Sequence, residues 1–176
     1  MKLPINPYLY LDTIIKEDIP ALIKWCNNED IYANTLSFPK SYTEEAGKTF
    51  LSIIEKTEKE NGFQVNWGIR LEETSELIGS IGILNFTGTP IYKTEIGYWL
   101  AEPFRNKGWT TAVVKTFTEM IVEKHNLIRV FAHVMDHNPA SVRVLEKAGY
   151  EKEGLLKSNI LKDGKAIDTW LLARTF

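Results

Sequence analysis

The sequence predicts an α/β fold with one mixed, mostly antiparallel sheet flanked by helices. Segments of strand length and apolar content alternate with segments whose apolar residues recur at helical spacing. One helical segment, residues 112–121, lies between two strand-like segments, and a strand–helix–strand connection makes its two strands parallel neighbours. With 176 residues, 44% of them hydrophobic, the chain has enough apolar residues for one core. We therefore expect a single domain over residues 1–176.

The first third of the chain predicts one strand followed by helices. Leu9–Ile15 has the β-branched and aromatic content of a strand. A helix is expected to begin near Asp18, with apolar residues at helical spacing at Ile19, Leu22, Ile23 and Cys26. The polar run 27–30 breaks it and leads into a loop or short helix. Thr43 is a suitable N-cap for the next helix, whose expected buried face consists of Phe50, Leu51 and Ile54.

Three strands are expected next, near Phe63–Leu71, Leu77–Phe86 and Thr94–Leu100. The polar turn at 72–76 joins the first two, which favours antiparallel pairing. After them comes a helix, whose apolar stripe consists of Ala112, Val113, Thr116, Phe117, Met120 and Ile121.

The last third predicts a strand, a helix and a hairpin. The strand is expected at Ile128–Val134. The helix has Asn138 as N-cap, Pro139 at its first position and Gly149 as its stop. The hairpin pairs two strands, Leu155–Leu161 and Ala166–Ala173, at the turn signal Asp163-Gly164.

Composition excludes several classes of protein. A formal net charge of −2 argues against a broad nucleic-acid surface, which is normally basic. The one cysteine, Cys26, rules out an internal disulfide, and its apolar helical neighbours favour a packing role over a reactive thiol. No segment resembles a signal peptide or approaches the roughly 20 apolar residues of a membrane span. We expect a soluble, cytoplasmic protein.

The segment Glu95–Ala112 is the most informative part of the sequence. An apolar strand ends at Pro103, a basic turn with a central glycine follows at Arg105–Thr110, and an amphipathic helix begins at once. Backbone N–H groups of such a turn, together with the positive end of the helix, form an anion site. The alternative is a basic surface turn that only caps the helix. The sequence favours a ligand that carries phosphates.

Two motifs and the order of elements resemble the GNAT N-acetyltransferase superfamily over nearly the whole chain. The first motif, Arg105–Thr110, is similar to the family's R/Q-x-x-G-x-G/A loop, with Thr110 in place of the last Gly/Ala. The second, Asn138–Tyr150, is similar to the Asn-x-x-Ser…Glu-Lys-x-Gly-Phe/Tyr helix of the ribosomal-protein N-terminal acetyltransferases of the RimJ/RimL type. Asp168 in the final hairpin also fits that branch.

The resemblance implies a cofactor, acetyl-CoA, and the residues that bind it. The turn and the start of the next helix would hold the pyrophosphate, and a Thr110 or Thr111 hydroxyl would donate to a phosphate oxygen. The strand that ends at Leu100-Ala101 would splay from its parallel neighbour and expose backbone groups to the pantetheine arm. The implied cofactor-binding residues are Leu100, Ala101, Arg105, Asn106, Lys107, Gly108, Trp109, Thr110, Thr111, Asn138 and Ser141.

Acetyl transfer to an amine also needs a base for the amine and an acid for the leaving thiolate. Many family members have a tyrosine where this chain has Leu145, so the resemblance implies Ser141 as the acid. A hydrogen-bonding role for Ser141 without proton transfer is the alternative. We expect Glu95 to be the base, and the alternatives are Glu102, His133 and Asp136.

The resemblance implies an acceptor groove lined by the first helices and the last hairpin. The residues concerned are Trp25, Tyr32, Phe38, Tyr42 and the loop Asn159–Lys165, all of which also suit an ordinary core. Three functions compete: acetylation of a protein or peptide N-terminus, acetylation of a small amine such as a polyamine, amino sugar or antibiotic, and acyl-CoA binding without turnover. The expected partners are acyl-CoA and an amine, without nucleic acid, membrane or metal, and a homodimer is possible.

Overall fold

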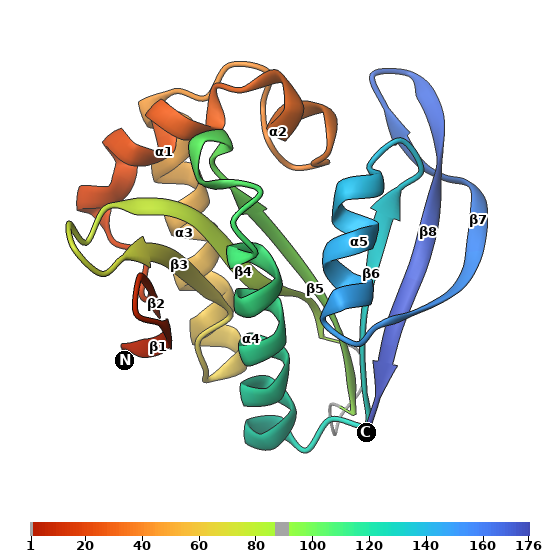
Figure 1. Ribbon diagram of the computed structural model, residues 1–176. Coiled ribbons are helices and arrows are strands. Elements are labelled where there is room, and N and C mark those ends of the chain that lie inside the picture. The colour runs from red at the N-terminus through yellow and green to blue at the C-terminus, as the bar shows by residue number, and fades with distance from the viewer. Residues whose placement is uncertain (1, 87–91) are drawn as a thin grey trace. The chain divides into compact units, whose positions relative to one another are not determined.

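The computed structural model describes residues 2–86 and 92–176. The strands of the described chain form one mixed sheet in the order β1-β2-β3-β4-β5-β6-β8-β7 (Figure 1). Their bounds are β1 Leu3–Asn6, β2 Leu9–Asp12, β3 Asn66–Leu71, β4 Leu77–Phe86, β5 Lys93–Leu100, β6 Arg129–Met135, β7 Glu151–Lys162 and β8 Lys165–Thr175. The helices are α1 Ile19–Cys26, α2 Glu29–Ala33, α3 Glu44–Asn61, α4 Trp109–His125 and α5 Pro139–Lys147, with short 3₁₀ helices η1 Lys16–Asp18 and η2 Glu102–Phe104.

The chain forms two compact units, and β4 and β5 each contribute residues to both. The first unit consists of residues up to Gly82 together with Tyr98–Trp109, and the second of Ile83–Gly97 together with Thr110–Phe176. The predicted α/β fold, with a mixed sheet and flanking helices, is confirmed. No helix in the described part of the chain is both long and apolar enough to cross a membrane.

In the first unit, antiparallel strands β1 to β4 are accompanied by α1 and α3, which lie side by side (Figure 1). Gly47 permits this close approach, because a Cβ there would lie 3.1 Å from Ile19 Cγ2 of α1. Thr43 caps α3 as predicted, by accepting a hydrogen bond from the Ala46 N–H. The core of the unit includes Leu22, Cys26, Ile31, Tyr42 and Trp99.

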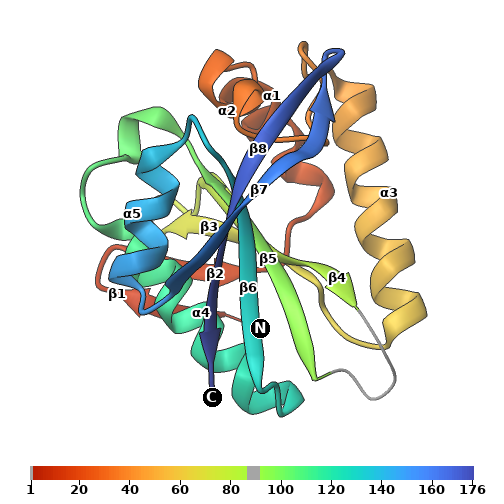
Figure 2. The same ribbon diagram turned by 90° about the vertical axis from the view of Figure 1, so that its right-hand side faces the viewer.

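In the second unit, β6 pairs in parallel with β5 and antiparallel with β8, which in turn pairs with β7. Helix α5 packs beside β7 and β8 (Figure 2). Asn138, Pro139 and Gly149 begin and end α5 as predicted, and Gly149 has a φ of +89°. The buried Tyr150 hydroxyl lies 2.7 Å from Thr118 Oγ1 on α4, and this hydrogen bond connects the segment after α5 to that helix.

The structure corrects the predicted elements at several places. Strand β1 is missing from the sequence prediction, because Pro4 and Pro7 argue against a strand. The sheet accepts Pro4 since β1 is an edge strand, where a missing N–H donor costs little. The strand expected at Leu9–Ile15 ends at Asp12, and the buried stripe of α4 also includes Val114 and Thr118. At the hairpin turn, Asp163 and Gly164 both have positive φ, as their sequence predicts.

Candidate active site

The basic turn between η2 and α4 has the backbone geometry of an anion site. Asn106 and Gly108 have φ of +63° and +75°, so both residues adopt the left-handed backbone conformation. None of the N–H groups from Asn106 to Trp109 donates a hydrogen bond within the described chain. A Cβ at Gly108 would meet no atom within 4 Å, which leaves the turn open on that side. Unpaired N–H groups at a turn before a helix are what a phosphate group binds.

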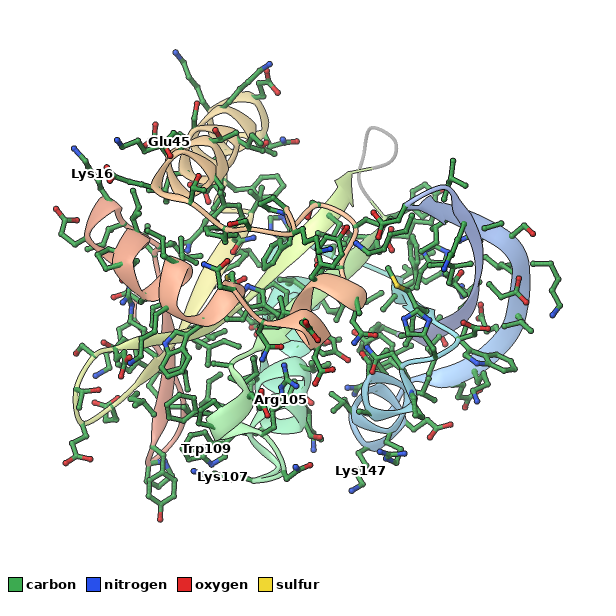
Figure 3. The ribbon with its side chains drawn as sticks, turned by 90° about the horizontal axis from the view of Figure 1, so that it is seen from above. Lys16, Glu45, Arg105, Lys107, Trp109 and Lys147 are labelled. Carbon is green, nitrogen blue, oxygen red and sulfur yellow. The ribbon has the colours of Figure 1, made fainter. Side chains whose placement is uncertain are left out.

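The side chains of the turn have structural partners. Trp109 stacks between Phe104 and Tyr8, with ring centroids 6.2 and 6.0 Å apart. Lys107 Nζ lies 4.8 Å from the centroid of Trp109, and Figure 3 shows these two side chains together at the turn. The ring of Trp109 is committed to the stack, so the predicted cofactor contact of this residue would have to come from its backbone.

Arg105 holds the turn against the rest of the first unit. Its Nε donates to the Leu100 carbonyl oxygen over 3.0 Å, and its Nη1 lies 3.2 Å from Asp30 Oδ2 on α2. A second contact joins the same two segments, from Asn28 Nδ2 to Glu102 Oε2 at 2.8 Å. Sequence reasoning identified Arg105 and Glu102 but not Asp30 of α2 or Asn28, the N-cap of that helix, because these pairings across more than 70 residues have no local signal.

Leu100 and Ala101 have most of their backbone groups already bonded. The Leu100 carbonyl accepts from Arg105, the Ala101 N–H donates to the Ile78 carbonyl, and the Ala101 carbonyl accepts from the Phe104 N–H. These bonds limit what the two residues offer to a ligand. Thr110 and Thr111, in the first turn of α4, are half-buried and belong to the second unit.

The parallel pairing of β5 and β6 stops early, as the resemblance implies. The paired residues run from Lys93 opposite Arg129 to Glu95 opposite Phe131. No further β5–β6 pair follows among the described residues, although β6 continues to Met135. The two strands therefore separate directly after Glu95.

Asn138 and Ser141 lie together at the start of α5. The Asn138 side-chain oxygen accepts a hydrogen bond from the Ser141 N–H at 3.1 Å, so the predicted cap is present. Both side chains are half-buried. Leu145, at the position of the family's tyrosine, is fully buried in the core. Tyr150 does not replace that tyrosine, because its hydroxyl is bonded to Thr118 and burial raises its pKa.

The candidate bases differ in their surroundings. Glu95 is buried, and its Oε1 lies 2.8 Å from His133 Nδ1, so two of the four candidates form one pair. Glu102 is exposed and belongs to the first unit, where Asn28 binds it. Asp136 is exposed, and its Oδ1 lies 3.4 Å from His137 Nδ1. The hydrogen bond that His133 donates to Glu95 raises the pKa of His133 against the opposing effect of burial.

The residues predicted to line the acceptor groove include several core residues of the first unit. Tyr42 is buried, and Trp25 and Phe38 pack against the same cluster. Cys26 is buried in this core, which supports its predicted packing role, and burial raises the pKa of its thiol to about 12. Five polar atoms in the described part of this unit are nevertheless buried without a hydrogen-bond partner: Trp25 Nε1, Asn34 Oδ1, Tyr42 Oη, Asn66 Oδ1 and Trp99 Nε1.

Asp168 has a structural partner set in the final hairpin. It accepts hydrogen bonds from the Ser158 N–H at 2.8 Å and from Lys157 Nζ at 2.7 Å. These bonds hold the irregular stretch of β7 between Leu156 and Ile160, where Ser158 has a φ of +49°.

The fold and the turn define a class: an α/β protein with an open glycine turn at a helix start and a parallel strand pair that separates. The model of the acetyltransferase (GNAT) domain matches residues 9–151. The chain therefore belongs to the GNAT acetyltransferase family, whose members use acetyl-CoA.

Curated relatives are bacterial N-acetyltransferases. The probable N-acetyltransferase YjcK of Bacillus subtilis is 32% identical over 126 residues, which is 72% of this chain and 68% of YjcK. The ribosomal protein uS5-alanine N-acetyltransferase of Escherichia coli is 26% identical over 71% of this chain and 64% of its own length. For some relatives the aligned part is under two thirds of their length, as with 59% of YoaA from Bacillus subtilis.

Solved structures share the fold. A RimL ribosomal L7/L12 α-N-protein acetyltransferase in complex with coenzyme A has a TM-score of 0.87 at 19% identity, covering 100% of this chain and 98% of that one. A GNAT-family acetyltransferase from Bacillus anthracis has a TM-score of 0.84 at 22% identity, covering 99% and 98%. At these identities the likeness shows the fold alone.

Proposed function

We propose that this protein is an acetyl-CoA-dependent N-acetyltransferase that transfers acetyl from the thioester to a primary amine by direct attack. One observation carries the proposal: the four N–H groups from Asn106 to Trp109, unpaired within the described chain, on a turn with positive φ at Asn106 and Gly108. Such donors at the start of α4 suit a pyrophosphate. The threonine hydroxyls at 110 and 111 would add donors to the phosphate oxygens.

Asn138 and Ser141 are proposed to act on the thioester end of the cofactor. Asn138 caps α5 and offers its amide to the pantetheine arm, and the Ser141 hydroxyl hydrogen-bonds or protonates the leaving thiolate. The full burial of Leu145 and the bonded hydroxyl of Tyr150 favour Ser141 over a tyrosine in this role. Glu95 is proposed to serve the amine side of the reaction.

The acceptor is proposed to be the N-terminal amine of a protein or peptide. The E. coli relative acts on an alanine of ribosomal protein uS5 according to its name, and the name of the RimL structure specifies a ribosomal protein N-terminus. The buried, unpartnered polar atoms of Trp25, Tyr42 and Trp99 support a ligand that forms hydrogen bonds near this cluster, because buried polar groups normally have partners. The expected homodimer and cytoplasmic location stay predictions.

A thiol-release assay with acetyl-CoA tests the proposal. The panel contains peptides with different N-terminal residues, polyamines and aminoglycosides. Release that depends on peptides supports the proposed acceptor, whereas release only with small amines would replace it. If no amine stimulates release while acetyl-CoA binds, the chain is an acyl-CoA-binding module and the proposal is wrong.

A glycine pair tests the turn itself. Gly108→Ala places a side chain at a φ of +75°, which strains the backbone of the turn and should displace its N–H groups. We therefore expect the KM for acetyl-CoA to rise about tenfold. Gly62→Ala is the matched control, because Gly62 ends α3 with the same φ and also has no atom within 4 Å of an added Cβ. Both variants carry the same backbone strain, and only Gly108→Ala should alter acetyl-CoA binding.

A further inference from the structure

Glu95 and His133 lie where the parallel strands β5 and β6 separate. Glu95 is in the last residue pair between the strands, opposite Phe131, and His133 is two positions further along β6. Because side chains alternate along a strand, Phe131 and His133 share a face. Beyond this point no β5–β6 pair is present in the described chain. The pair therefore marks the place where the sheet opens.

The contact between the two side chains has a defined direction. Glu95 Oε1 lies 2.8 Å from His133 Nδ1, and because a carboxylate only accepts, the ring donates this hydrogen bond from an N–H at Nδ1. The proton on Nδ1 leaves Nε2 as the nitrogen with a free lone pair. Nε2 has no hydrogen-bond partner in the part of the chain that the structure describes. The side chain of Glu95 is 11% exposed and that of His133 is 28% exposed, so the imidazole is the more accessible member.

We infer that His133 Nε2 accepts the proton of the acceptor amine, and that Glu95 is a positioning residue that acts through His133. The inference rests on the proposed acetyltransferase function. Glu95 holds the imidazole in one tautomer and one orientation, and stabilises the imidazolium that forms. A carboxylate bound to one nitrogen of a histidine supports proton transfer at the other in this way.

The proton balance is complete without another reactant. His133 Nε2 takes one proton from the ammonium form of the acceptor, and the freed lone pair forms the C–N bond to the thioester carbon. The tetrahedral intermediate collapses, the C–S bond breaks, and its electron pair leaves on the thiolate. The second amine proton goes to that sulfur, directly or through Ser141. The imidazolium then releases its proton to water.

The charges around His133 suit this role. Glu95 raises the pKa of His133 above the ordinary 6.5 of histidine, against the effect of burial. Lys93 lies two positions before Glu95 on β5, and Arg129 lies four positions before His133 on β6, where Glu153 of β7 binds it. The β8 residue opposite His133, Leu171, carries no charge. An imidazole with a raised pKa matches an amine whose free pKa is about 8 better than a carboxylate does.

The pH dependence of kcat/KM in the thiol-release assay tests the inference. In the wild type, activity should rise with pH along an acid limb with an apparent pKa above 6.5. His133→Gln should lose that limb and fall at least about a hundredfold in kcat/KM at pH 7.5, since the imidazole that takes the amine proton is gone. Glu95→Gln keeps a hydrogen-bond acceptor for Nδ1 but loses the charge. The Glu95→Gln variant should keep the acid limb, shifted to lower pH, and its loss of kcat/KM should be smaller than that of His133→Gln.

Controls separate a catalytic loss from misfolding. Calorimetric titration with coenzyme A should give unchanged affinity for both variants. His125→Gln is the matched control, because it removes a histidine with a lowered pKa at the end of α4 and should leave the limb in place. An NMR titration of the His133 ring protons should give a lower pKa in Glu95→Gln than in the wild type. The acid limb of kcat/KM should shift to lower pH by the same amount, which a purely structural role for Glu95 would not produce.

The outcomes are distinct. If His133→Gln keeps the acid limb, or if Glu95→Gln alone abolishes it, the proton acceptor is not His133 and the inference is wrong while the proposed function stands. If the wild type shows no amine-dependent release with any acceptor, the proposed function fails and the inference fails with it.

Discussion

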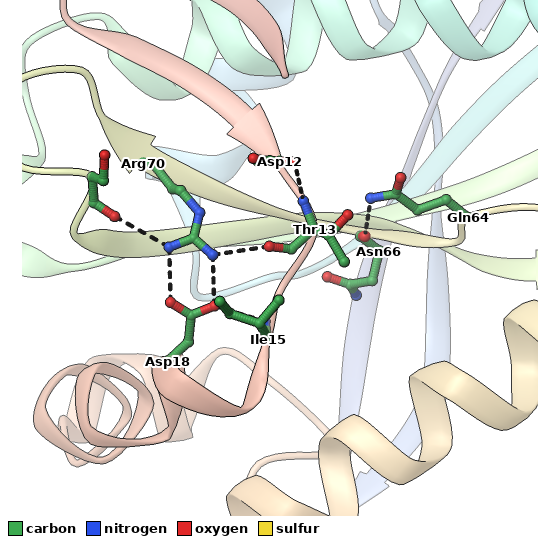
Figure 4. A network of polar contacts seen from close by, with 8 residues as sticks. Asp12, Thr13, Ile15, Asp18, Gln64, Asn66 and Arg70 are labelled. Atoms are coloured by element: carbon green, nitrogen blue, oxygen red, sulfur yellow. Dashed lines mark hydrogen bonds and ion pairs between the residues drawn. The ribbon is translucent and has the colours of Figure 1, made fainter. Parts of the chain in front are cut away.

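Asp18 and Glu95 are both buried carboxylates that bind a basic side chain, one in each unit, but their partners differ. Arg70 meets Asp18 through two parallel hydrogen bonds of 2.8 and 2.6 Å, and it also donates to the Thr13 and Ser75 carbonyl oxygens (Figure 4). Glu95 meets a single nitrogen of His133. Arginine stays charged in proteins, whereas histidine gains and loses its proton near neutral pH.

This difference separates a structural contact from one suited to proton transfer. The Asp18 and Arg70 side chains are 8% and 9% exposed, and the described neighbours bind the guanidinium on both of its outer nitrogens. The Asp18 carboxylate also accepts from the Ile15 N–H, so the pair fixes the loop between β2 and α1. The Asp18–Arg70 pair is permanently charged, and its guanidinium is bonded on both outer nitrogens, so it stabilises the fold. In the Glu95–His133 pair, Nε2 of the imidazole can exchange a proton with a ligand.

Removal of the Asp18 carboxylate should give the largest change in stability. In Asp18→Ala the Arg70 guanidinium stays charged and buried without its counter-ion, so we expect the free energy of unfolding to fall by about 3–5 kcal/mol. Urea denaturation followed by circular dichroism measures it. Glu76→Ala, which breaks the exposed pair with Lys24, is the control and should cost at most about 1 kcal/mol. Equal losses of stability in the two variants would show that other groups or water stabilise the Arg70 charge when the Asp18 carboxylate is absent.

The two pairs also show which features can be predicted from the sequence and which cannot. The cap at Asn138, the stop at Gly149 and the turn at Asp163-Gly164 follow from local chemistry and were predicted correctly. The Asp18–Arg70 and Glu95–His133 pairs join residues 52 and 38 positions apart. Such pairs depend on strand register and helix placement, which no local pattern encodes.

The candidate site was likewise predicted only in part: its local motifs were found from the sequence, and its long-range contacts were not. The glycine turn and the separating strand pair could be predicted because a family motif carries them, and Glu95 and His133 were each named as candidate bases. That the two bind each other follows only from the β5–β6 register. Asn28 and Asp30 were predicted only as part of a polar break, because their contacts with Glu102 and Arg105 join distant segments and the five-residue helix α2 has a weak sequence signal.

Removal of the Glu95 carboxylate should cost less stability than removal of Asp18. His133 responds by losing its proton, so Glu95→Ala leaves no buried charge behind, and we expect a loss of about 1–2 kcal/mol from the missing hydrogen bond. The same urea series measures it. A loss as large as that of Asp18→Ala would mean that His133 stays charged without its partner, which would contradict its role as a group that exchanges protons.

The smallest expected effect is the pH dependence of the Glu95 contribution. The folded-state pKa of His133 is raised above its unfolded value. The charged pair therefore adds stability that is fully present below pH 6.5 and is lost as pH rises through the folded-state pKa. The stability difference between the wild type and Glu95→Gln should accordingly shrink from pH 6 to pH 9. The difference between the wild type and Asp18→Ala should stay constant over the same range, because Arg70 keeps its proton throughout. A constant Glu95 difference would mean that His133 binds Glu95 only as a neutral ring, and proton uptake at Nε2 would then lack the electrostatic support of Glu95.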